Sequence, residues 1–154
     1  MNKKYFDEII RISKNQIIFG GNYFIEFLTN SSCWIVWDKD NTGNFADCEL
    51  AWTNFKTAVR KIKFRWNGLL QENMKDKEER FHPTQKPVAL FQWILNNYST
   101  PGMTIFDPFA GSGTTAIACL ETGRNYILIE KEKDYIDIIN KRIATWKEQG
   151  RLFA

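Results

Sequence analysis

Apolar residues along the first half of the chain recur at helical spacing and then in short runs. Between residues 4 and 13 they fall three or four positions apart, so we predict that the chain opens inside a helix, without a capping residue before it. Two apolar runs, 16–19 and 33–37, predict short buried strands, and residues 23–28 between them predict one or two helical turns. From 45 to 66 apolar and polar positions alternate, which is the period of a half-exposed antiparallel hairpin.

The second half of the chain alternates between strand-like and helix-like segments. A polar stretch with a weak pattern, residues 67–81, predicts a short surface loop. The elements predicted after it are a helix at 87–98, a strand at 104–106, a helix at 114–121, a strand at 126–129 and a helix at 133–149. Strands and helices in alternation, with short connections, predict a parallel sheet in an α/β fold, and we take residues 1–154 as one domain.

Composition and charge exclude several classes of protein. The net charge of +3 permits a polyanionic partner without requiring one. Three cysteines, without a C-x-x-C spacing, suit neither a disulfide framework nor a zinc site, so we expect no metal. The start of the chain lacks the apolar core of a signal peptide, and no apolar run approaches the roughly 20 residues of a membrane span. We therefore expect a soluble protein of the cytoplasm that does not contact membranes.

The stretch T-I-F-D-P-F-A-G-S-G-T-T, residues 104–115, carries the first candidate chemistry. Asp107 ends a predicted strand, where ligands of an open parallel sheet bind. Gly111 and Gly113 would let the backbone approach such a ligand, and the first N–H groups of the following helix suit an anionic group. A tight turn that uses glycines for geometry alone is the other interpretation. A phosphate-binding P-loop is excluded, because no lysine follows the glycines.

An acid at the end of the next predicted strand strengthens the case for a ligand. Glu130 follows Asp107 by 23 residues, at a place where a carboxylate can accept hydrogen bonds from a ribose diol. An acid at a strand end is commonly only solvated. Together with the glycine turn, Glu130 indicates a cofactor that contains adenosine.

The run H-P-T-Q-K-P, residues 82–87, makes the pattern specific. The chain resembles the DNA N6-adenine and N4-cytosine methyltransferases, because it contains, in this order, H-P-T-Q-K-P, D-P-F-A-G-S-G-T-T and I-L-I-E-K. This order matches the permuted arrangement of the family, in which the cofactor motifs lie C-terminal to the catalytic ones. Residues 16–24, 34–39 and 49–66 also resemble this family, so the resemblance covers nearly the whole chain. A different Rossmann-like nucleotide-binding protein is disfavoured, because such proteins do not require H-P-T-Q-K-P.

The resemblance implies a Rossmann-like methyltransferase fold with S-adenosyl-L-methionine as cofactor, double-stranded DNA as partner, and a bacterial or phage-infected cell as location. Three groups of residues would hold the cofactor. The H-P-T-Q-K-P segment would approach the methionine carboxylate, the glycine loop would enclose the methionine part, and an acid would bind the ribose. In this sequence these residues are Thr84, Gln85 and Lys86; Asp107, Phe109, Ala110, Gly111, Ser112, Gly113 and Thr114; and Glu130.

One part of the family's pattern is not found in these 154 residues. The family grips the methyl acceptor with a tetrapeptide of the D-P-P-Y type, and the sequence contains no Pro-Pro pair. We therefore expect no catalytic residue in this chain. We also expect an incomplete fold that lacks the central catalytic strand at its N-terminus, and low stability unless residues 16–19 and 104–106 pair directly. The alternatives are a truncated, non-catalytic remnant and one half of a split enzyme that needs a second chain or a homodimer.

Basic residues gather just before residues 67–81, the loop at the family's target-recognition position. A surface that contacts the DNA backbone and a lysine-rich edge strand are equally favoured interpretations. The residues are Lys56, Arg60, Lys61, Lys63 and Arg65.

Overall fold

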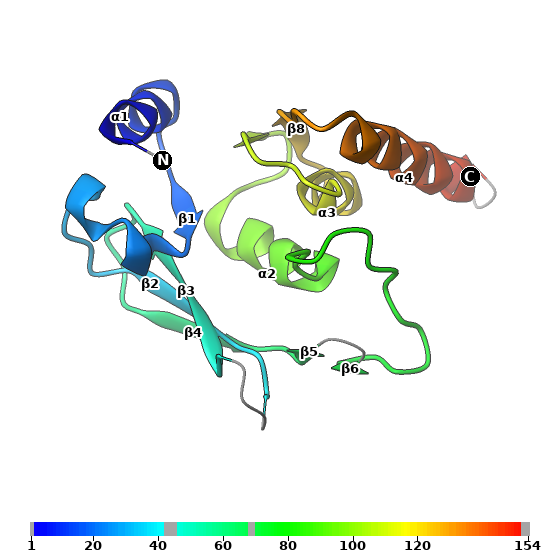
Figure 1. Ribbon diagram of the computed structural model, residues 1–154, viewed down its shortest axis with the longest axis horizontal. Helices are drawn as coiled ribbons and strands as arrows, with labels where there is room; N and C mark the ends of the chain where they lie inside the picture. The colour runs from blue at the N-terminus through cyan, green and yellow to red at the C-terminus, as the bar shows by residue number, and fades with distance from the viewer. Residues whose placement is uncertain (1, 42–45, 68–69, 152–154) are drawn as a thin grey trace. The chain divides into compact units, whose positions relative to one another are not determined.

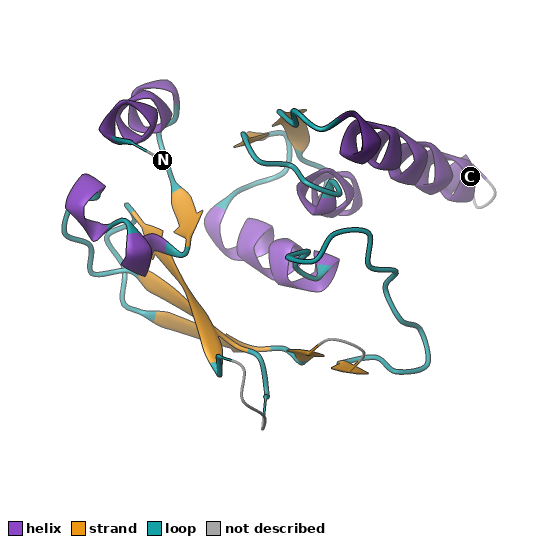
Figure 2. Ribbon diagram, in the orientation of Figure 1, coloured by secondary structure: helices purple, strands orange, loops and turns teal. Residues whose placement is uncertain are grey.

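The computed structural model describes residues 2–41, 46–67 and 70–151, which form two compact units, Met1–Asp76 and Lys77–Ala154. Figure 1 labels the helices and strands, and Figure 2 distinguishes them by colour. The division into two compact units does not test the expectation that residues 1–154 form one domain, which stays a prediction.

The first unit opens with helix α1, Lys3–Ile12, as the spacing of apolar residues predicted. The expectation that no capping residue precedes the helix is wrong. Asn2 is the N-cap, and its side-chain oxygen accepts a hydrogen bond from the backbone N–H of Tyr5 at 3.3 Å. The buried ring of Phe6 packs between Phe24 and Phe27, which lie in and beside two short 3₁₀ turns, η1 (Gly21–Tyr23) and η2 (Ile25–Phe27).

A four-stranded sheet completes the core of this unit. Its strands are β1 (Ile17–Phe19), β2 (Trp34–Asp38), β3 (Cys48–Thr53) and β4 (Arg60–Lys63), in the order β1-β3-β2-β4. Strand β3 runs antiparallel to both β1 and β2, whereas β4 runs parallel to β2. Buried residues of β2 and β3, including Ile35, Trp37, Ala51 and Trp52, fill the core.

The hairpin predicted over residues 45–66 is therefore wrong. Strand β2 lies between β3 and β4, and the antiparallel hairpin is formed by β2 with β3. Strand β3 is central and buries its last three residues, while β4 pairs with β2 alone among the described residues and exposes its charged side chains. The apolar end of β3 and the charged residues of β4 follow each other in the sequence, and together they produce the alternation expected of a single hairpin.

The predicted surface loop contains a small element of its own. Strands β5 (Trp66–Asn67) and β6 (Leu70–Gln71) pair antiparallel over two residues, and turns and bends follow. Residues 68 and 69 of that loop lie outside the described residues. A role for the loop in target recognition stays a prediction.

The second unit confirms the predicted order of strands and helices. Its elements are α2 (Val88–Tyr98), β7 (Thr104–Asp107), α3 (Thr114–Thr122), β8 (Asn125–Leu128) and α4 (Lys133–Arg151). Strands β7 and β8 are parallel, so that both end at the same edge of the sheet. Helix α3 buries its first six residues, and it contacts α2, α4 and both strands. In the described ranges β7 pairs only with β8, and β1 only with β3.

A buried arginine fastens the edge of this unit at which the strands begin. Arg124, which precedes β8 directly and is 8% exposed, donates hydrogen bonds to the carbonyl oxygens of Leu95 and Ser99 at 3.0 and 2.9 Å. Leu95 lies in the last turn of α2, and Ser99 is the C-cap of this helix. Arg124 thus joins the end of α2 to the start of β8.

Candidate functional site

The loop between β7 and α3 is held in shape by the acid that ends the strand. One oxygen of Asp107 accepts a hydrogen bond from the backbone N–H of Phe109 at 3.0 Å, and the other accepts one from the hydroxyl of Thr115. The backbone N–H of Ala110 donates to the carbonyl oxygen of Ile129 at 3.0 Å, so the loop runs beside the end of β8. The ring of Phe109 is exposed at the turn, and Ala110 is buried.

Two glycines give this loop a backbone that other residues rarely adopt. Gly111 has φ +51°, and Gly113, the N-cap of α3, has φ +80°. A Cβ on Gly113 would lie 2.9 Å from Cγ1 of Ile139, a buried residue of α4, whereas a Cβ on Gly111 would meet nothing closer than the His82 ring at 3.9 Å. Gly113 therefore allows α4 to pack closely on the loop, and Gly111 leaves space beside His82.

Glu130, directly after β8 and Ile129, connects the second strand to the same loop. One of its oxygens accepts the backbone N–H of Gly111 at 2.9 Å, and the other accepts those of Lys131 and Glu132 at 2.8 and 3.0 Å. These three donors, the N–H of Glu132 above all, lower the pKa of the Glu130 carboxyl group. The carboxylate is ionised near neutral pH, and it remains able to accept further hydrogen bonds.

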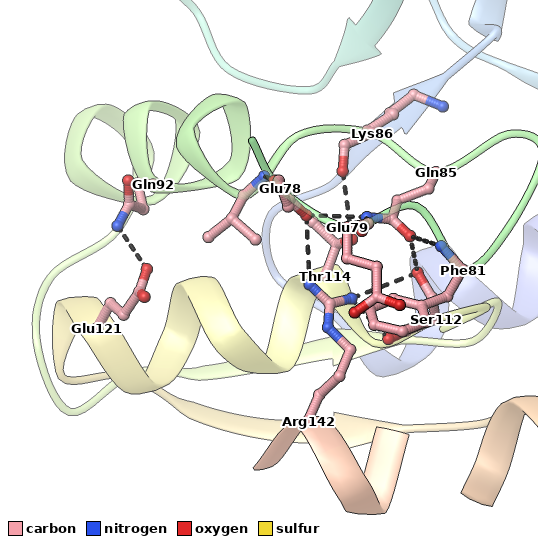
Figure 3. A network of polar contacts seen from close by, with 11 residues as sticks. Glu78, Glu79, Phe81, Gln85, Lys86, Gln92, Ser112, Thr114, Glu121 and Arg142 are labelled. Atoms are coloured by element: carbon pink, nitrogen blue, oxygen red, sulfur yellow. Dashed lines mark hydrogen bonds and ion pairs between the residues drawn. The ribbon is translucent and has the colours of Figure 1, made fainter. Parts of the chain in front are cut away.

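The H-P-T-Q-K-P segment lies against the glycine loop. The side-chain oxygen of Gln85 accepts a hydrogen bond from the hydroxyl of Ser112 at 2.8 Å, and the hydroxyl of Thr114 donates to the carbonyl oxygen of Lys86 at 3.2 Å. Gln85, Ser112 and Thr114 are buried. Figure 3 shows that the amine of Lys86 points away from these contacts. Hydrogen bonds thus join two segments whose bonded residues are 27 and 28 positions apart in the sequence.

On the other side of this segment Thr84 is exposed and His82 is half-buried. The backbone N–H of Thr84 donates to Nδ1 of His82 at 3.1 Å, which fixes the orientation of the imidazole ring. The ring centroid of His82 lies 4.6 Å from that of Tyr135 in the first turn of α4. His82 therefore borders the space beside Gly111, and its ring contacts that of Tyr135.

Two further residues of this network, Glu78 and Arg142, belong to no motif of the sequence. Glu78 lies in the predicted surface loop and Arg142 lies in the middle of α4, yet they form an ion pair of 3.2 Å. Their side chains are only 23% and 12% exposed. Burial raises the pKa of Glu78, and the N–H of Val88 and the charge of Arg142 oppose this effect. Figure 3 shows the pair joined to Gln85 and Ser112.

Three of the five basic residues predicted before the loop form ion pairs with two acids that lie at and just after the end of β2. Lys61 pairs with Asp38 at 2.8 Å, Lys63 pairs with Asp40 at 2.7 Å, and Arg65 also pairs with Asp40. The ion pair with Lys61 lowers the pKa of Asp38, and that with Lys63 lowers the pKa of Asp40. These contacts favour the interpretation of a charged edge strand, and a DNA-binding role for the patch stays a prediction.

An open groove of about 540 Å³ lies elsewhere in the second unit. It is lined by residues of α3, α4 and the segment before H-P-T-Q-K-P, among them Phe81, Ile117, Glu121 and Trp146. None of the residues predicted to hold the cofactor lines it.

The described residues contain neither a metal-binding cluster nor a membrane-spanning helix. In residues 2–41, 46–67 and 70–151, no group of three or more His, Cys, Asp or Glu side chains is placed to hold a metal ion. None of the helices in those ranges has the length and apolar character needed to cross a membrane.

The sequence matches parts of two curated bacterial proteins. It is 43% identical over 78 residues to the Type II methyltransferase M.HinfI of Haemophilus influenzae, a match that covers 50% of this chain and 22% of the relative. It is 38% identical over 89 residues to the Type II methyltransferase M2.DpnII of Streptococcus pneumoniae, which covers 58% of this chain and 33% of the relative. The matched segment thus spans a third or less of the length of each relative.

A solved structure and a family model extend the likeness to most of the chain. The crystal structure of M1.HpyAVI in complex with SAM shares the fold with a TM-score of 0.66 and 26% identity, over 92% of this chain and 82% of that one. The model of the N6/N4 family, described as DNA methylase, matches residues 14–141. That range includes the H-P-T-Q-K-P segment, the glycine loop and Glu130. The chain therefore belongs to the DNA methylase family of N6 and N4 methyltransferases.

Proposed function

We propose that this chain is the cofactor-binding part of a DNA methyltransferase that acts on an exocyclic amino group, N6 of adenine or N4 of cytosine, with S-adenosylmethionine as methyl donor. One observation carries the proposal. The three segments that the sequence singled out meet in one unit, where Gly111 donates to Glu130 and Ser112 donates to Gln85. Independent segments with structural roles alone would not need to converge at the ends of two parallel strands.

The residues at this edge of the sheet fit the chemistry of the cofactor. Glu130 is an ionised acceptor, which suits the two hydroxyls of a ribose. The N-terminus of α3 presents backbone N–H groups and a positive dipole end, which suits a carboxylate. Gly111 leaves room for close approach beside His82. When bound, S-adenosylmethionine supplies a methyl group on a positively charged sulfur.

We assign separate roles to the residues of the site. Glu130 would bind the ribose, Thr84 and Lys86 would approach the methionine carboxylate, and Phe109 would cover the ligand from the exposed tip of the loop. Asp107 shapes the loop through Phe109 and Thr115, because both of its oxygens are already used there. Gln85 is buried, with bonds to Glu78, Phe81 and Ser112, so its contribution is to hold the loop.

Double-stranded DNA is the proposed partner, and a bacterial cytoplasm is the proposed location. The relatives in Haemophilus influenzae and Streptococcus pneumoniae are Type II methyltransferases, which supports both proposals. On this chain the exposed residues Lys56, in the connection before β4, and Arg60, the first residue of β4, are the first candidates for contact with DNA phosphates.

Calorimetric titration with S-adenosylmethionine tests the proposed cofactor. We expect the wild-type chain to bind, and Glu130→Ala to weaken binding by roughly 1–3 kcal/mol, because a charged acceptor of hydrogen bonds is lost. Glu148→Ala, which removes an exposed carboxylate from α4, is the control and should bind as the wild type does. A folded chain that releases no heat at millimolar cofactor would refute the proposal.

A further inference from the structure

A closed ring of hydrogen bonds joins four residues around the middle of the glycine loop. The guanidinium of Arg142 donates to the carbonyl oxygen of Ser112 at 2.8 Å and to Oε1 of Glu78 at 3.2 Å. Glu78 Oε1 also accepts from the amide of Gln85 at 2.9 Å, and the oxygen of that amide accepts from the hydroxyl of Ser112 at 2.8 Å. Figure 3 shows these contacts. Each member of the ring therefore bonds to two others.

The ring is anchored to two further residues of the second unit, Val88 and Phe81. The second oxygen of Glu78 accepts from the backbone N–H of Val88, the first residue of α2, at 2.8 Å. The oxygen of Gln85 also accepts from the backbone N–H of Phe81 at 2.9 Å, and the guanidinium of Arg142 lies 5.3 Å from the centroid of the Phe81 ring. The ring thus fixes the loop relative to α2, α4 and the segment before H-P-T-Q-K-P.

Ser112 is the residue through which the ring of hydrogen bonds can hold the backbone conformation of the glycine loop. It lies between two glycines at positive φ, whose backbones have more accessible conformations than those of other residues. Its carbonyl oxygen and its hydroxyl are both held by the ring. If Arg142 is lost, the carbonyl oxygen loses a charged donor inside the protein, and the partly buried Glu78 loses this ion pair. The loop is then free to adopt other conformations.

We propose that Arg142 and Glu78 are positioning residues for the cofactor site, which hold the glycine loop in its ligand-binding shape without contacting the ligand. The expected effect on cofactor binding rests on the function proposed above. The expected effect on the conformation of the glycine loop does not depend on that function. The guanidinium suits this task because its rigid fork can serve Ser112 and Glu78 together.

The same unit contains a matched control. Arg124 is a buried arginine that also donates to backbone carbonyl groups, but it lies at the edge where the strands begin, and the glycine loop lies where they end. Arg124→Met should lower the stability of the unit without a selective effect on the loop. Arg142→Met removes a similar arginine from the loop itself.

The experiment compares both variants with the wild-type chain by two measurements. In cofactor-free protein, amide hydrogen exchange at Gly111 and Gly113 should be about tenfold faster in Arg142→Met than in Arg124→Met, relative to amides in the middle of α3. In calorimetry with S-adenosylmethionine, Arg142→Met should raise Kd about tenfold or more, whereas Arg124→Met should stay within about threefold of wild type. Glu78→Gln keeps the acceptor for Gln85, so both effects should be smaller than in Glu78→Ala.

The proposal is overturned if Arg142→Met leaves loop exchange unchanged, or if Arg124→Met has the same effects on the loop and on Kd. If Arg142→Met does not fold, loop exchange and Kd are compared between Glu78→Gln and Glu78→Ala instead. Equal effects of these two variants would overturn the proposal. A wild-type chain that does not bind the cofactor would refute the proposed function, and the exchange measurement would still decide whether Arg142 positions the loop.

Discussion

The 154-residue chain is expected to bind S-adenosylmethionine and yet transfer no methyl group to DNA. The lone pair of an exocyclic amino group is delocalised into the base, so the amino group needs acceptors that make it more nucleophilic and a ring that stacks on the flipped base. In the family that this chain resembles, a D-P-P-Y type tetrapeptide supplies both. The sequence has one Asp-Pro pair, at Asp107, and both oxygens of that acid are used by the loop.

An assay with tritium-labelled S-adenosylmethionine tests this expectation. It measures the incorporation of tritium into DNA duplexes that contain adenine and cytosine. Counts should remain at background for the chain alone, while a complete amino-methyltransferase assayed in parallel labels the same duplexes. Sustained turnover by the purified chain would mean that acceptor-binding groups lie among these 154 residues and that the assignment of the catalytic segment is wrong.

Gly113→Ala is expected to be the most damaging single methyl addition at the site. Left-handed backbone costs alanine about 1–2 kcal/mol relative to glycine, and forcing a methyl against a packed side chain adds about 1–3 kcal/mol. Both apply at Gly113, where φ is +80° and the added Cβ would lie 2.9 Å from Cγ1 of Ile139. The sum is a large part of an ordinary stability of roughly 5–15 kcal/mol. The loop would also have to move, and cofactor binding should be lost.

Gly102→Ala is the matched control for this prediction. Gly102 has φ +85°, and a Cβ there would meet nothing within 4 Å, so only the backbone cost applies. Urea unfolding should give a smaller loss of stability for Gly102→Ala than for Gly113→Ala. Shortening Ile139 to alanine should partly compensate Gly113→Ala in a double-mutant cycle. Equal losses at the two glycines would mean that contact with α4 is not what requires glycine in the loop.

The sequence predicted the elements of the second unit well because its signals there are local. Apolar periodicity marks α2, α3 and α4, the glycine loop marks the end of β7, and Gly123 marks the turn before β8. The arrangement of β2, β3 and β4 could not be obtained in this way. Alternation reports which side of a strand is buried, but it does not report which strand lies between two others. Asn2 was missed for a simpler reason, since a single cap residue at the start of a chain carries a weak signal.

The candidate site was predictable only in part. The motifs identified Asp107, Gly111, Gly113 and Glu130, and the structure places them at one edge of the sheet. Nothing local distinguishes Arg142 from the other basic residues of α4, and its partner Glu78 lies 64 residues away in a polar stretch. Their importance arises from burial at a shared position, which is a property of the fold.

A map of where S-adenosylmethionine binds tests the proposed cofactor site most directly. In a titration of the ¹⁵N-labelled chain followed by NMR, this site assignment predicts that amide shifts concentrate at Thr84, Lys86, Gly111, Gly113 and Glu130, and that they saturate together. Shifts that instead concentrate in the groove around Ile117, Glu121 and Trp146, or that are absent at saturating cofactor, would contradict it.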